Sequence, residues 1–130
     1  MVKVVARFKD GTVLKGTTQD FAHGKEQFHM MPWDNPGHVV TVRTADLKAV
    51  FFVKDYEGDY THIERNTFEG PIDSGAHPIR VVFEDDEELI GTTYSYRPER
   101  HGFFLVPADE DSNIERCYVI KASTKIVELL

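Results

Sequence analysis

The sequence predicts an all-β protein made of two tandem five-stranded small barrels, residues 1–54 and 78–130, joined by a linker over residues 55–77. Three observations support this: the chain repeats itself, its apolar residues alternate in short runs, and no segment keeps a helical apolar period over three turns. The repeat has a constant offset of 75 residues, as between Phe8 and Phe83. The identical pairs are Phe8/Phe83, Asp10/Asp85, Leu14/Leu89, Gly16/Gly91, Thr17/Thr92, Thr18/Thr93, Phe28/Phe103, Pro32/Pro107 and Asp34/Asp109.

In the first copy, alternating apolar residues predict five short strands. Asp10-Gly11 predicts a tight hairpin between the first two, because glycine tolerates the positive φ of such turns. Gly16 lies inside the second strand, which indicates a bulge or a sharp bend. The segment before the fifth strand, 44–48, is short and fits a single 3₁₀ turn. The expected strands are 2–8, 12–18, 28–31, 39–43 and 50–53.

The second copy repeats this layout, with Gly91 in the place of Gly16 and a single turn at 122–124. Its expected strands are 79–83, 89–93, 103–106, 117–120 and 126–129. Cys117 lies in an apolar run and is expected to be a buried strand residue. Apolar positions shared by both copies should form the cores: Val4/Ile79, Ala6/Val81, Phe8/Phe83, Leu14/Leu89, Phe28/Phe103 and Met30/Leu105.

The small size of each copy predicts that the copies associate. A domain of about 60 residues buries only about 60% of its unfolded surface and is marginally stable alone. We therefore expect the two copies to pack on each other, or the chain to form a homodimer through the more apolar second copy. If the copies face each other across a pseudo-twofold axis, Arg7 and Lys9 meet Glu84.

This layout resembles the Sm-like and SH3-like small barrels, in which a bent, glycine-bearing second strand follows a tight turn and a 3₁₀ turn precedes the fifth strand. The stretches 102–109 with Ser112-Asn113, and 47–53, also look like an uncharacterised bacterial domain family. That resemblance implies no known activity. The Sm-type RNA-binding signature is not legible, because the Asn after strand three and the Gly after strand four are not in matching places.

Composition and charge narrow the class of protein. The chain has 130 residues, 41% hydrophobic and 28% charged, and a net charge of −7. Residues 1–65 hold nine basic and nine acidic side chains, whereas residues 66–130 hold six and thirteen. An acidic half disfavours general nucleic-acid and anionic-membrane binding and is compatible with a basic protein partner. With no apolar run or signal-peptide pattern, a cytoplasmic location is the expectation.

The clusters that could carry metal or catalytic chemistry all fail a closer test. The acidic run 84–88 falls on a hairpin tip, where charges are usually solvated. Asp109, Asp111 and Asn113 imitate a calcium loop, but Ile114 stands where its glycine belongs. The six histidines lack metal-ligand spacing, one cysteine excludes cysteine zinc sites, and no nucleophile or phosphate-loop motif occurs. We predict no catalytic residue, no metal and no cofactor.

One loop of the second copy is the strongest functional candidate. It brings two aromatic and three basic or imidazole side chains onto an otherwise acidic half: Tyr94, Tyr96, Arg97, Arg100 and His101. Tyrosine and arginine are enriched at binding hot spots, and arginine can fork onto a phosphate or carboxylate. The structural alternative is that the tyrosines complete the core while the arginines neutralise nearby acids.

The sequence therefore favours a non-catalytic protein-interaction or regulatory module. A sensor that binds a small anionic ligand or nucleotide through this loop is the second hypothesis, and a metal-dependent enzyme is a distant third.

Overall fold

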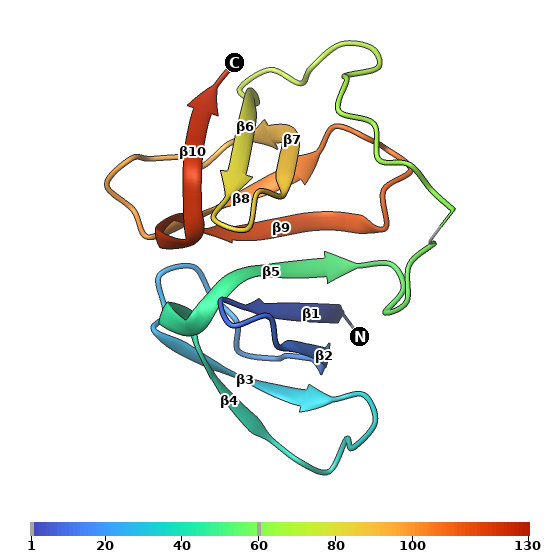
Figure 1. Cartoon of the computed structure of the whole chain (residues 1–130), viewed down its shortest axis with the longest axis vertical. Coiled ribbons are helices and arrows are strands. Elements are labelled where there is room, and N and C mark those ends of the chain that lie inside the picture. Colours follow the sequence, from blue (N-terminus) through green and yellow to red (C-terminus); the bar gives the residue numbers. More distant parts are fainter. Residues whose placement is uncertain (1, 60) are drawn as a thin grey trace.

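The computed structural model describes residues 2–59 and 61–130 and confirms an all-β fold (Figure 1). Within these residues there is no α-helix, and so none long and apolar enough to cross a membrane. Two 3₁₀ turns, η1 (Thr44–Asp46) and η2 (Lys121–Ser123), lie where short turns are expected. The strands are β1 (Lys3–Phe8), β2 (Val13–Thr17), β3 (Gln27–Pro32), β4 (Val40–Arg43), β5 (Leu47–Val53), β6 (His77–Phe83), β7 (Glu88–Thr93), β8 (Gly102–Pro107), β9 (Ile114–Ile120) and β10 (Thr124–Leu129).

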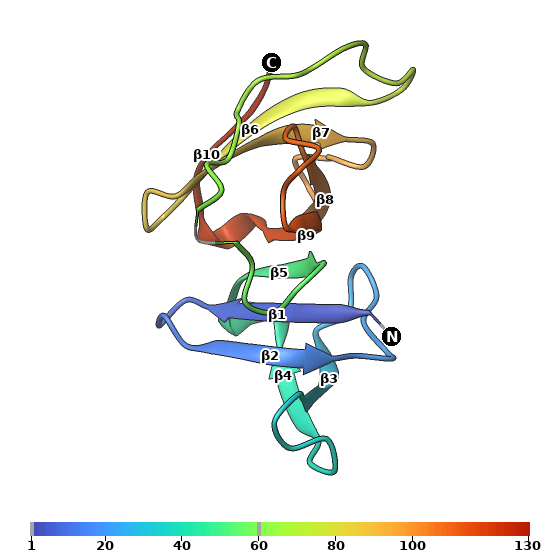
Figure 2. The ribbon, with the colours of Figure 1, turned by 90° about the vertical axis from the view of Figure 1, so that its right-hand side faces the viewer.

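The ten strands form one continuous antiparallel sheet that does not close, in the order β10-β6-β7-β8-β9-β5-β1-β2-β3-β4. The two copies are joined where β5 pairs with β9, from Ala49 opposite Val119 to Val53 opposite Ile114. Figures 1 and 2 show β5 and β9 side by side in the middle of the molecule, with one half on each side. The halves therefore share their backbone hydrogen bonding as well as packing.

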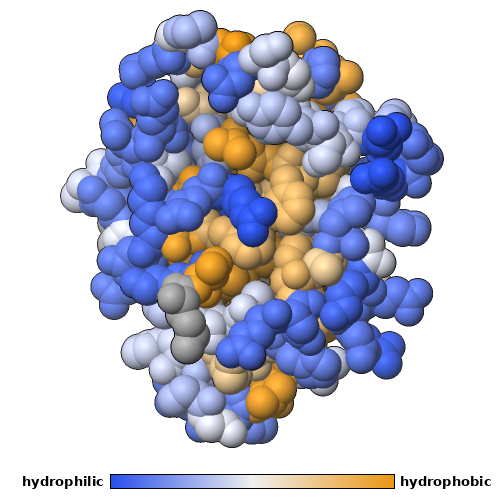
Figure 3. All heavy atoms as spheres, turned by 180° about the vertical axis from the view of Figure 1, so that it is seen from behind, coloured by the Kyte–Doolittle hydropathy of each residue, from blue (hydrophilic) through white to orange (hydrophobic). Residues whose placement is uncertain are grey.

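The two joining strands are buried on both faces, so each contributes to two cores. Ala49, Phe51 and Val53 of β5 belong to the core of the second half, while Val50 and Phe52 belong to the core of the first. In β9, Cys117 and Val119 lie in the second core, and Tyr118 and Ile120 in the first. Seen from behind, hydrophobic surface runs through the middle of the molecule across both halves, between hydrophilic margins (Figure 3).

The predicted apolar pairs form these cores. Ten of the twelve shared positions are buried, and the other two, Phe8 and Leu14, are partly buried and pack against the first core. Cys117 is buried as expected, and burial raises the pKa of its thiol.

Polar contacts between the halves differ from the sequence expectation. Lys48 donates to Asp85 at 2.7 Å and to Glu87 at 2.6 Å, and its ammonium lies 4.7 Å from the centre of the Phe83 ring. The expected meeting of Arg7 and Lys9 with Glu84 is wrong, because the halves are not related by a twofold axis. Strand five of the first copy meets strand four of the second, so unlike edges face each other.

Both second-strand glycines mark a close approach of two backbones. A Cβ on Gly16 would lie 2.1 Å from the carbonyl oxygen of Met31, and one on Gly91 would lie 2.0 Å from that of Val106. The pairing of β2 with β3 and of β7 with β8 shows no register shift at these glycines. The expected bulge is therefore wrong. Glycine occurs there because the next strand crosses directly over it.

Candidate functional site

Tyr96, one of the five predicted binding residues, belongs to the core of the second half. Its ring packs edge-on against Phe103, with ring centres 4.9 Å apart. Phe21 packs against Phe28 in the same way, at 5.0 Å, and lies 75 residues before Tyr96. Tyr96 thus covers the end of its core as its counterpart does, which is the structural alternative that the sequence left open.

Tyr94 and Arg97 also lie apart from the other predicted residues. Tyr94 is 62% exposed, and its phenol donates to the Asp73 carboxylate at 3.3 Å. Arg97 is exposed on the same loop. Neither lines the cleft that Arg100 and His101 enter. The five predicted residues therefore do not form one site.

Arg100 and His101 line a cleft of about 910 Å³ between the two halves. We call it the basic cleft, because five basic side chains line it against only two acidic ones, Glu26 and Glu99. Three of the five come from the first half and two from the second: Lys9, Lys25 and Arg43, with Arg100 and Lys121. The sequence singled out only Arg100 among them, because the other four belong to segments that the β5–β9 pairing brings together.

The two walls of the basic cleft are held by the same backbone contact. In the first half, the Thr44 amide donates to the carbonyl of Glu26 at 2.9 Å, and in the second the Lys121 amide donates to that of His101 at 2.9 Å. Each contact fixes the loop after a second strand to the 3₁₀ turn before a fifth strand. Lys121 Nζ also donates to the carbonyl of Pro98. Both loops are thereby held facing each other.

A hydrogen-bonded chain orients Arg100 within the cleft. The Arg100 guanidinium contacts His23 Nε2 at 3.3 Å, and His23 Nδ1 contacts Tyr118 Oη at 2.9 Å. Because arginine can only donate, Nε2 must accept, and the proton of a neutral His23 lies on Nδ1. Burial raises the pKa of the Tyr118 phenol, which stays protonated. Arg100 is thus held by one residue from the first half and one from the second.

The positive charge of the basic cleft is not neutralised by the protein. None of its five basic side chains forms an ion pair with a carboxylate in the described part of the chain, whereas Lys48, Arg65, Arg80 and Lys125 all do. Unpaired cations lining one concave surface produce a positive potential that attracts anions. On a chain with a net charge of −7, this local potential is opposite in sign to the whole.

Comparison with known proteins places the chain in a family. A family of unknown function, DUF6982, matches residues 1–130. The chain belongs to this family. No curated protein and no solved structure matches the chain. The description of DUF6982 assigns no activity, so the function of this member has to be argued from its clefts.

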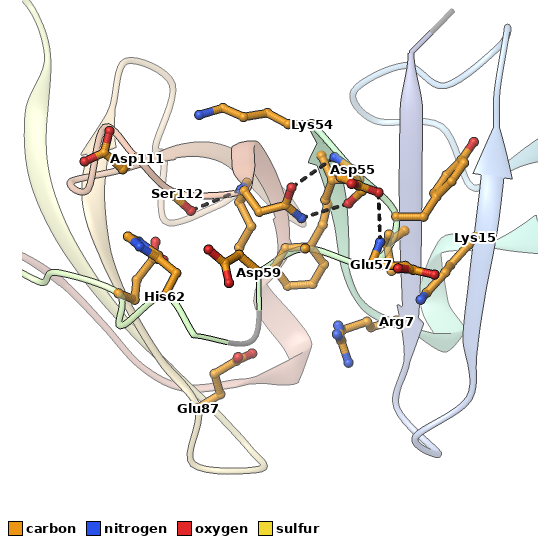
Figure 4. Close-up of a pocket in the computed structure, with 18 residues that line it drawn as sticks. Arg7, Lys15, Lys54, Asp55, Glu57, Asp59, His62, Glu87, Asp111 and Ser112 are labelled. Carbon is orange, nitrogen blue, oxygen red and sulfur yellow. Dashed lines mark hydrogen bonds and ion pairs between the residues drawn. The ribbon is translucent and has the colours of Figure 1, made fainter.

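The DUF6982 chain has a second cleft, of about 760 Å³, at the opposite end of the β5–β9 pairing (Figure 4). Six acidic side chains and three basic ones line it, and we call it the acidic cleft. The linker crosses it and is held by Asn113, which donates to the carbonyl of Asp55 at 2.9 Å and accepts from its amide at 3.0 Å. Figure 4 shows these contacts between the labelled Arg7 side and the His62 side. The linker thus fills part of this cleft.

A carboxylate latch holds the next part of the linker to the second half. The Asp109 side chain is fully buried and accepts from the Arg65 amide at 2.9 Å, the Arg65 guanidinium at 3.1 Å and the Asp111 amide at 2.9 Å. His62 Nε2 contacts it at 2.8 Å. His62, Glu64 and Asp109 could together offer three ligand atoms to a metal ion. The Arg65 guanidinium already neutralises Asp109, so the group fits a structural latch better than a metal centre.

The latch predicts a pH-dependent release of the linker. The Arg65 amide, the Asp111 amide and His62 lower the pKa of Asp109 from 3.8 to about 2. A lowered pKa stabilises the folded state fully above pH 3.8, and this stabilisation is lost as the pH falls toward 2. We expect Asp109→Asn to increase cleavage of the linker by a nonspecific protease at neutral pH.

Asp34→Asn is the matched control, because Asp34 is the exposed counterpart of Asp109 in the first half. Limited proteolysis followed by mass spectrometry measures the rate. Equal cleavage rates for wild type, Asp34→Asn and Asp109→Asn would show that the latch does not hold the linker.

The acidic run 84–88 is mostly neutralised within the protein. Asp85 and Glu87 bind Lys48, Asp86 binds Lys125, and Glu88 binds Arg80. Lys48 lowers the pKa of Asp85 by hydrogen bonding. These carboxylates tie the hairpin to neighbouring strands, and they do not converge on a cation site.

Proposed function

We propose that this DUF6982 member is a non-catalytic protein-interaction module, and that its basic cleft binds an acidic segment of a partner protein. The observation that carries the proposal is the set of five unpaired basic side chains that two distant parts of the chain bring to one cleft. Lysine and arginine bind carboxylates strongly where water is partly excluded, and arginine does so bidentately.

The form of the cleft suits an extended segment. It is open and lies between two loops, one after β2 and one after β7. Besides the charged groups, its lining includes the apolar side chains of Ala45, Ile120 and Ala122. A segment with alternating acidic and apolar residues would satisfy both kinds of surface.

A small anion such as a nucleotide is the second candidate. The observation that favours it is the preorganised Arg100, which His23 and Tyr118 hold from opposite halves. A guanidinium fixed in advance loses little entropy when it binds a phosphate. Volume does not exclude this candidate, because ligand pockets span about 300–1,000 Å³.

Two further expectations belong to the same proposal. The halves follow one strand order, share the 3₁₀ turn before strand five and share the close-approach glycine, which supports their interpretation as tandem Sm-like or SH3-like barrels that are joined edge to edge. The acidic remainder of the chain supports a cytoplasmic module that does not bind nucleic acids generally.

Binding of a fluorescein-labelled oligoglutamate peptide, measured by anisotropy, tests the proposal. We expect Arg43→Glu and Arg100→Glu each to weaken binding by about tenfold, since each replaces an attraction with a repulsion. Added salt should also weaken binding, because exposed charges are screened.

Arg97→Glu is the matched control: it makes the same charge change in the same loop outside the cleft. Equal losses for Arg97→Glu and Arg100→Glu would mean that only net charge matters, and the proposal would be wrong. If ATP raises the melting temperature while the peptide does not bind, the small-anion candidate replaces the acidic segment.

A further inference from the structure

The junction inside the chain joins two different strand edges. The free edge of a fifth strand, β5, pairs with the free edge of a fourth strand, β9. A contact between unlike surfaces can be repeated by further copies, and it closes into a ring or extends as a filament. A contact between like surfaces would end at two.

The same two kinds of edge remain free at the ends of the sheet. β10, the fifth strand of the second half, is at one end, and β4, the fourth strand of the first half, is at the other. In the described part of the chain neither has a second strand partner. An unpaired edge strand exposes a row of backbone donors and acceptors and readily accepts another strand.

These two edges carry exposed apolar side chains. On and just after β10, Ile126 is 41% exposed, Leu129 56% and Leu130 61%. Beside β4, Val39 is 57% exposed. In the internal junction, the positions equivalent to Ile126 and Leu129 are Ala49 and Phe52, which are buried.

We propose that the β10 edge of one molecule pairs with the β4 edge of a second copy, head to tail, in the geometry of the β5–β9 junction. The register follows from the two 3₁₀ turns, since Leu47 and Thr124 each directly follow one and lie 77 residues apart. Phe52 pairs with Arg116 inside the chain. The same offset of 77 places Leu129 of one copy opposite Val39 of the next.

Cysteine crosslinking of mixed variants tests this register. Leu129→Cys and Val39→Cys are expected to form a covalent dimer when the two variants are mixed and oxidised. Directly opposed residues in antiparallel strands lie about 4.5–5.5 Å apart at Cα, within the range that disulfides span. The native Cys117 is buried and does not interfere.

Either variant alone is expected to stay uncrosslinked, because each would meet an unmodified residue. Dimers from Leu129→Cys alone, as abundant as in the mixture, would indicate a β10–β10 homodimer and overturn the proposal. Absence of crosslinking in the mixture would overturn it as well.

Sedimentation measures the assembly itself. We expect the wild-type chain to form a species that is a multiple of 14.9 kDa, and Leu129→Lys to reduce it to the monomer. Val106→Lys alters a residue that is 44% exposed and lies away from both edges, so it should leave the assembly intact. A wild-type monomer at the highest soluble concentration, or an assembly unaffected by Leu129→Lys in a folded protein, would contradict the proposal.

Discussion

Residues 1–54 and 78–130, expressed separately, are expected not to fold. In an isolated first half, Phe51 and Val53 of β5 would lose the core of the second half and face water. In an isolated second half, Tyr118 and Ile120 of β9 would be exposed in the same way. Burial of one large apolar side chain contributes about 2 kcal/mol. A few such losses approach the whole free energy of unfolding of an ordinary domain, about 5–15 kcal/mol.

Thermal unfolding followed by circular dichroism measures this effect. A full-length chain cut once in the linker near Gly75 is the matched control, because it breaks the covalent link and leaves β5 and β9 paired. We expect the cut chain to melt cooperatively and the separate halves to show no transition. If residues 1–54 alone melt cooperatively at the temperature of the full chain, the halves are independent domains.

Gly91→Ala is expected to be the most destabilising single methyl addition in the second half. Its Cβ would lie 2.0 Å from the Val106 carbonyl oxygen and 2.8 Å from a methyl of Leu105. A backbone oxygen cannot move without displacing β8, whose pairing with β7 is centred there. Overpacking of this kind costs about 3 kcal/mol. The melting temperature should fall by roughly 10 °C.

Gly37→Ala is the control for this substitution. Nothing lies within 4 Å of the Cβ that it would add. Its free energy of unfolding should match that of the wild type or rise slightly, since alanine restricts the unfolded chain. A similar melting temperature for Gly91→Ala and Gly37→Ala would contradict the close approach of β7 and β8.

The sequence predicts the local structure well because alternation and turn residues act over short distances. Asp10-Gly11 makes the expected hairpin, with φ of +91° at Gly11, and Asp86 takes the same conformation at φ of 73°. The joining of the halves could not be predicted this way. The apolar runs of β5 and β9 show only that both faces are buried, and not which strands lie beside them.

The candidate site shows the same limit. Aromatic and basic side chains within one loop pointed to a patch, yet Tyr96 packs into the core and only Arg100 and His101 reach the basic cleft. Lys25 and Arg43 were missed because their relation to Arg100 depends on the β5–β9 pairing. The one signal in the sequence was the counterpart loop 19–26, which carries Lys25 at the position 75 residues before Arg100.

Titration of the ¹⁵N-labelled chain with unlabelled oligoglutamate peptide, followed by amide chemical shifts, tests the proposed site most directly. We expect the amides of Lys25 and Arg43 in the first half and of Arg100 and Lys121 in the second to shift together along one saturation curve, because one ligand contacts both walls. The amides of Asp55 and Asp111, at the acidic cleft, should stay unchanged. Shifts confined to one half, or centred on the acidic cleft, would contradict a binding site built jointly by the two halves.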